Sequence, residues 1–121
     1  MPAESKEVKQ IRKVVNETKL IDTHEHLQRE ENRIKGEVDV LATFFLQYAS
    51  SDLISSGLSY RDYQTILDPT QPLEQRWKIF SPFWENIKNT SYARVLNIAS
   101  KDLYGDEIND QTYKKISKRM K

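Results

Sequence analysis

A single short extended run in an otherwise helix-patterned chain is the feature that most constrains this fold. The run Leu20-Ile21-Asp22-Thr23-His24 is too short for an apolar helix and favours a strand, which we place at residues 20–27. One strand cannot form a sheet, because its backbone N–H and C=O groups need partners on neighbouring strands. The strand therefore either has partners outside this sequence or is not a strand in isolation, and we expect residues 1–121 to form a single incomplete domain.

The remaining apolar residues recur at helical spacing. Ser59 is expected to cap one short helix together with Asp62, Gly105 to end another, and Asp110 to begin the last. Pro82 lies inside a helical stripe, so it must either kink that helix or restart it with Ser81 as the cap. The patterns predict helices near residues 4–18, 38–55, 59–67, 72–88, 91–104 and 110–119.

Two apolar sets are the candidates for a core. A dense aromatic set has two interpretations, a cap over a substrate pocket or the core of a helical segment, and its helical spacing favours the core. A second set shares one face of the helix expected at 91–104. The first set comprises Phe44, Phe45, Tyr48, Trp77, Phe80, Phe83 and Trp84, and the second Tyr92, Val95, Leu96, Ala99 and Leu103.

Composition excludes several classes of function. Nineteen basic residues against 18 acidic ones give a net charge of +1, which offers no electrostatic basis for binding nucleic acid or an anionic membrane. The sequence has no cysteine, so disulfides and thiolate metal sites are excluded. The polar N-terminus is unlike a secretory signal, and the apolar clusters are too short to cross a bilayer. We expect a cytoplasmic protein without nucleic-acid or membrane partners, in which an oligomer is possible.

The stretch Asp22-Thr23-His24-Glu25-His26 carries the chemistry. Side chains alternate along an extended backbone, so His24 and His26 share one face and can present imidazole nitrogens to a common point. A helix would splay the same two rings apart. The pair therefore predicts two metal ligands, and the alternative is two histidines on a surface loop.

Three neighbouring residues have open roles. Asp22 lies on the same face as the histidines, where it either orients a ligand histidine or is satisfied by backbone N–H groups. Arg29 and Arg33 follow the motif and either bind a substrate carboxylate or are solvated loop charges, of which the second is the commoner.

The segment Ile21-Asp22-Thr23-His24-Glu25-His26-Leu27 resembles the first-strand signature of the amidohydrolase superfamily, in the group that also holds uronate-isomerase-like and decarboxylase-like members. The later runs 84–92, 102–105 and 108–113 resemble the helical insertion after that strand. The resemblance implies an α/β fold, namely the N-terminal fragment of a (β/α)8 TIM-like barrel. Within it, residues 20–27 would be the first strand and residues 37–121 a mostly helical insertion.

The resemblance also implies a site. His24 and His26 match the family's first-strand metal ligands, and the metal would be zinc, with manganese or iron as alternatives. The family's other ligands, and the aspartate that acts as general base, would lie outside this chain, because the sequence contains no third histidine. The complete protein would be a metal-dependent hydrolase of a small molecule, and the 121-residue chain alone would be inactive. Isomerisation of a uronate, decarboxylation, or a non-catalytic helical interaction module are the alternatives.

Overall fold

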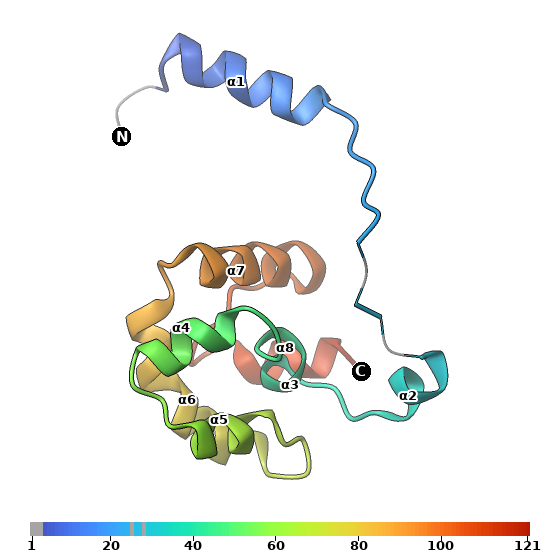
Figure 1. Ribbon diagram of the computed structural model, residues 1–121, viewed down its shortest axis with the longest axis vertical. Coiled ribbons are helices and arrows are strands. Elements are labelled where there is room, and N and C mark those ends of the chain that lie inside the picture. Colours follow the sequence, from blue (N-terminus) through green and yellow to red (C-terminus); the bar gives the residue numbers. More distant parts are fainter. Residues whose placement is uncertain (1–3, 25, 28) are drawn as a thin grey trace. The chain divides into compact units, whose positions relative to one another are not determined.

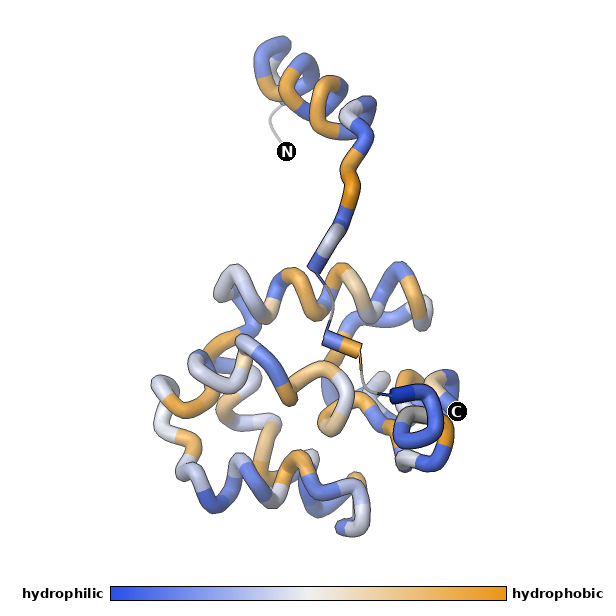
Figure 2. The backbone as a smooth tube through the Cα atoms, turned by 45° about the vertical axis from the view of Figure 1, so that its right-hand side comes forward, coloured by the Kyte–Doolittle hydropathy of each residue, from blue (hydrophilic) through white to orange (hydrophobic). Residues whose placement is uncertain are grey.

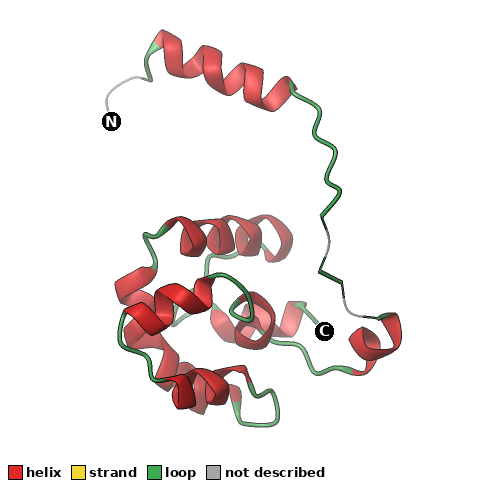
Figure 3. Ribbon diagram, viewed as in Figure 1, coloured by secondary structure: helices red, strands yellow, loops and turns green. Residues whose placement is uncertain are grey.

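The computed structural model describes residues 4–24, 26–27 and 29–121. The chain divides into two compact units, residues 1–34 and residues 35–121, and each is described by itself. Every regular element within the described ranges is a helix (Figures 1 and 3).

The first unit is built around α1 (Lys6–Glu17), where a helix was expected. The hydroxyl of Ser5 accepts the Val8 N–H at 3.3 Å and caps its first turn. The helix places Val8, Ile11 and Val15 on one face, as predicted, yet within this unit none of its residues is buried. A helix of this length is marginal in water on propensity alone, so its apolar face contributes little to stability as it stands.

The α/β fold class is wrong for this chain. The described residues of 20–27 form no strand, and neither do any of the others, so the structure is all-helical rather than a barrel fragment with a first strand. The physical reason lies in the first unit itself, where no neighbouring strand is present to complete a hydrogen-bonded ladder. Glu25 and Gln28 lie outside the described residues. The described residues between α1 and the short helix α2 (Glu30–Lys35) form no regular element.

The second unit packs six helices around one core. They are α3 (Val40–Phe44), α4 (Ala49–Ser55), α5 (Tyr60–Leu67), α6 (Leu73–Ile87), α7 (Ser91–Tyr104) and α8 (Tyr113–Arg119). The helix α6 packs on α4 and α5, while α7 packs on α4 and α8 (Figure 1). Short helices of this kind depend on such packing, because five to eight residues do not form a stable helix alone.

The helix expected at 38–55 is two helices in the structure. It is interrupted at residues 45–48, between α3 and α4. The break turns Phe45 fully into the core, and the Tyr63 hydroxyl donates to the Phe45 carbonyl at 3.0 Å. Because that carbonyl no longer has an intrahelical partner, the Tyr63 hydroxyl replaces the lost hydrogen bond.

Local capping signals predicted helix ends well, with one exception. Ser59 caps α5 as expected, accepting the Asp62 N–H at 3.0 Å and donating to the Asp62 carboxylate at 2.8 Å. Asp110, however, does not begin the last helix, because Thr112 occupies the N-cap of α8. The Asp110 carboxylate instead accepts the indole N–H of Trp77 at 2.7 Å.

Pro82 neither ends nor restarts α6, which runs unbroken through it from Leu73 to Ile87. Proline removes the hydrogen bond to the carbonyl four residues earlier, that of Lys78. Lys78 is exposed, so water can satisfy this carbonyl.

Aromatic side chains form the centre of the core, as the helical spacing indicated. Phe80 is fully buried between Phe45, with ring centroids 4.5 Å apart, and Trp84, at 5.7 Å. The ring of Trp77 stacks on that of Tyr113 at 4.3 Å, which ties α6 to α8. Figure 2 shows apolar positions on the helices that meet there.

The buried face of α7 is turned away from the one expected, although Leu96 of the expected stripe still packs against the core. Of the predicted core stripe, Val95 is 61% exposed and Leu103 is 72% exposed, whereas the small residues Ala93 and Ser100 are fully buried. Small side chains allow the backbone of α7 to approach its neighbours closely. The Ser100 hydroxyl then donates to the Asp106 carbonyl at 2.8 Å, which fixes this face inward.

Substituting Gly105 with alanine should destabilise the second unit by about 1–2 kcal/mol. Gly105 ends α7 in the left-handed region at φ +82°, and an added Cβ would lie 3.0 Å from an Arg119 guanidinium nitrogen. Urea unfolding followed by circular dichroism would measure the change. Gly36→Ala is the control, because Gly36 is exposed and has a negative φ. An equal loss in both variants would contradict the prediction.

Candidate two-histidine metal site

The two histidines lie on the irregular segment between α1 and α2 and are both exposed. Their side chains extend to the same side of the chain, as alternation along an extended backbone predicts. The Nε2 atoms of His24 and His26 lie 2.6 Å apart, and the ring centroids are 4.5 Å apart at 63°. The two Nε2 atoms are thus within hydrogen-bond distance, with the tautomers of the rings deciding which one donates.

The donor set fits two positions of a metal site. Bonds of about 2.0–2.1 Å at tetrahedral angles place two ligand nitrogens about 3.3 Å apart, so the rings need to separate by about 0.7 Å. The exposed chain around them allows such a movement. Within the described residues, no cluster brings three or more His, Cys, Asp or Glu side chains together.

Asp22 makes a local contact. Its carboxylate accepts the backbone N–H of His24 at 3.0 Å. This is an aspartate turn of the kind that fixes local backbone direction. Of the two roles considered for Asp22, the geometry favours satisfaction by a backbone N–H, which positions the His24 backbone rather than its ring.

Arg29 and Arg33, the two predicted substrate-binding residues, are described to different extents. Arg29 is exposed immediately before α2, where its carbonyl accepts the Asn32 N–H at 3.0 Å. Arg33 lies within α2, and its side chain is outside the described part of the structure. No described contact links either arginine to the histidines.

A buried ion pair in the second unit was missed by sequence reasoning. The carboxylate of Asp39 accepts the N–H groups of Leu41 and Ala42, each at 3.0 Å, and also pairs with the guanidinium of Arg76. Arg76 is 1% exposed and donates further to the carbonyls of Ile66, at 2.9 Å, and Gln71, at 3.0 Å. The signal was present, because Arg76 falls on the apolar stripe of Leu73, Trp77 and Phe80.

Comparison with known proteins gives no match, whether to protein-family models, to curated proteins or to solved structures. None of the helices in the described ranges has both the length and the apolar character needed to cross a membrane.

Proposed function

We propose that this chain supplies two metal ligands, His24 and His26, to a metal-dependent hydrolase of the amidohydrolase superfamily. The observation that carries the proposal is the convergence of the two Nε2 atoms at 2.6 Å. The sequence resemblance around residues 21–27 supports the reaction class.

In this proposal the residues of the chain have separate roles. His24 and His26 hold a divalent ion, zinc with manganese or iron as alternatives, and Asp22 restrains the backbone that leads into His24 by accepting the His24 N–H. A bound metal would act as a Lewis acid: it would polarise a carbonyl and activate water for attack on a carbon–heteroatom bond. Three protein ligands are usual at a catalytic zinc, so the remaining ligand and the general base lie outside this chain. Isomerisation of a uronate and decarboxylation are the alternative reactions of the same metal.

A second candidate is a helical interaction module without catalysis. The observation that favours it is the second unit, in which residues 35–121 build an aromatic core from helices alone. In that case the two histidines are surface residues and bind no metal.

Zinc titration of the 121-residue chain should distinguish the two candidates. Two imidazoles without a third ligand are expected to bind zinc with micromolar or weaker affinity, and His24→Ala and His26→Ala should each remove that binding. Calorimetry gives the affinity, and NMR of the imidazole Hε1 protons identifies the ligands. No turnover of amides, esters or uronates is expected from the chain alone.

Thr23→Ala is the matched control, because Thr23 is exposed and adjacent to His24 but is not a proposed ligand. It should bind zinc as the unsubstituted chain does. Absence of histidine-dependent binding would remove the metal proposal and favour the interaction module. Nanomolar binding, or turnover that disappears in His24→Ala, would show that the site is complete within this chain.

A further inference from the structure

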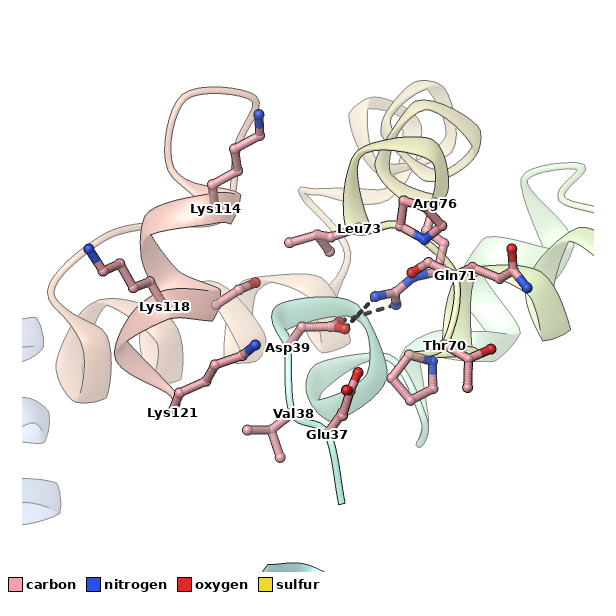
Figure 4. Close-up of a pocket in the computed structure, with 13 residues that line it drawn as sticks. Glu37, Val38, Asp39, Thr70, Gln71, Leu73, Arg76, Lys114, Lys118 and Lys121 are labelled. Atoms are coloured by element: carbon pink, nitrogen blue, oxygen red, sulfur yellow. Dashed lines mark hydrogen bonds and ion pairs between the residues drawn. The ribbon is translucent and has the colours of Figure 1, made fainter. Parts of the chain in front are cut away.

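A cavity of about 440 Å³ opens in the second unit, away from the two histidines in sequence. It lies between the start of α3, the loop before α6 and the side of α8 (Figure 4). Its volume falls in the range of small-molecule sites, about 300–1,000 Å³.

One wall of this cavity carries charges that are already satisfied. Asp39 and Arg76 pair with each other, and both are almost fully buried. Because their charges cancel, this pair provides a rigid polar wall without a net charge for a ligand.

The opposite wall is basic. Lys114, Lys118 and Lys121 follow one another at i, i+4 and i+7, so they share one side of α8 and the residues after it. Figure 4 shows the Lys121 ammonium extended toward Asp39 and Val38. Lys114 forms an ion pair with Glu74, whereas Lys118 and Lys121 form none with any residue in the described ranges.

The other basic residues of α8 are engaged away from the cavity. Lys115 and Arg119 both contact the Asp106 carboxylate, at 2.8 Å and 2.7 Å. The hydrogen bond from Lys115 holds the pKa of the Asp106 carboxyl below its ordinary value. The basic residues of α8 therefore divide by face: Lys115 and Arg119 share the Asp106 carboxylate, whereas Lys118 and Lys121 line the cavity.

Glu37 is the remaining charged residue of the cavity lining, and it forms no ion pair with the described residues. Its single negative charge opposes two positive ones, so the lining retains a net positive charge after the internal pairs are subtracted. An anion that enters would lie near the Lys121 ammonium group and would be repelled by Glu37, and the exposed Lys118 side chain could turn toward it from the same helix face.

We propose that this cavity binds the oxyanion group, phosphate or carboxylate, of a small molecule, with Lys118 and Lys121 as its charge partners. The proposal does not depend on the metal site, because no residue of the cavity belongs to residues 1–34.

The test is NMR titration of the folded 121-residue chain with inorganic phosphate in one arm and citrate in another, at constant ionic strength. Amide shifts of residues 37–39, 69–73 and 114–121 should saturate with at least one of the two probes. The double variant Lys118→Ala/Lys121→Ala should bind that probe about tenfold more weakly, and Glu37→Gln should bind it several-fold more tightly.

Lys78→Ala is the control for loss of a lysine elsewhere on the surface, because Lys78 is exposed and does not line the cavity. It should leave the affinity unchanged. Circular dichroism is expected to show all variants folded, since each replaced side chain is exposed. The proposal is overturned if neither probe saturates, if the double variant binds like the unsubstituted chain, or if Lys78→Ala weakens binding equally. These outcomes are independent of zinc binding by His24 and His26.

Discussion

Arg76→Ala should lower the free energy of unfolding of the second unit by about 3–5 kcal/mol. The substitution leaves the Asp39 carboxylate buried without its cation, and it removes donors from the carbonyls of Ile66 and Gln71. Small domains have only about 5–15 kcal/mol of stability in total. Urea unfolding followed by circular dichroism is therefore expected to show a variant that is barely folded at room temperature.

A double-mutant cycle separates the lost pair from the buried charge left behind. Arg76→Met alone should cost nearly as much as Arg76→Ala, because Asp39 remains charged and buried. Adding Asp39→Asn should recover part of that loss, since asparagine is neutral and still accepts the N–H groups of Leu41 and Ala42. If the two losses simply add, the pair contributes no coupling and the argument from buried charge is wrong.

The predicted strand shows where a residue pattern stops being informative. Leu20 and Ile21 have the composition of a strand, yet a strand exists only where a neighbour completes its hydrogen bonds, and no partner is available within the first unit. The relative position of the His24 and His26 rings could be predicted without knowing the strand's partners. Alternation along any extended backbone brings the two rings to one side, so that part of the site could be predicted without the sheet.

Helix ends could be predicted from local sequence, whereas the buried faces of helices depend on contacts between distant residues. Ser59 and Gly105 act through hydrogen bonds or backbone angles within a few residues, so local sequence predicts them. The break after α3 depends on the Tyr63 hydroxyl, which is 18 residues away from Phe45. The inward face of α7 depends on Ser100 and its contact with the Asp106 carbonyl, and size-based periodicity selects larger residues of a neighbouring face, such as Val95 and Leu103.

The cavity and its ion pair required tertiary information of another kind. An arginine on an apolar stripe indicates a buried anionic partner. Local sequence does not identify that partner, because Asp39 lies 37 residues before Arg76. Likewise, the basic end of the sequence reads as one charged run. Only the fold separates Lys115 and Arg119, which pair with Asp106, from Lys118 and Lys121, which line the cavity.

Trp84→Ala should destabilise the second unit by about 3–5 kcal/mol, as large as the loss expected for Arg76→Ala. Trp84 is 2% exposed, and its ring contacts those of Phe45 and Phe80 at centroid distances of 5.4 Å and 5.7 Å. Its indole N–H also donates to the Ile108 carbonyl at 3.0 Å. Alanine would leave a cavity between α3 and α6 and remove the donor from a buried carbonyl. Urea unfolding monitored by far-UV circular dichroism measures the loss.

One further variant separates the packing loss from the hydrogen-bond loss, and a second serves as an exposed control. Trp84→Phe keeps a ring between Phe45 and Phe80 but leaves the Ile108 carbonyl without its donor, so it should cost about 1–3 kcal/mol. Leu103→Ala removes a large apolar side chain from the exposed face of α7, and a change within about 0.5 kcal/mol is expected. If Leu103→Ala were as destabilising as Trp84→Ala, the face of α7 that bears Leu103 would have to be part of a packed surface, and its assignment to the exterior would be wrong.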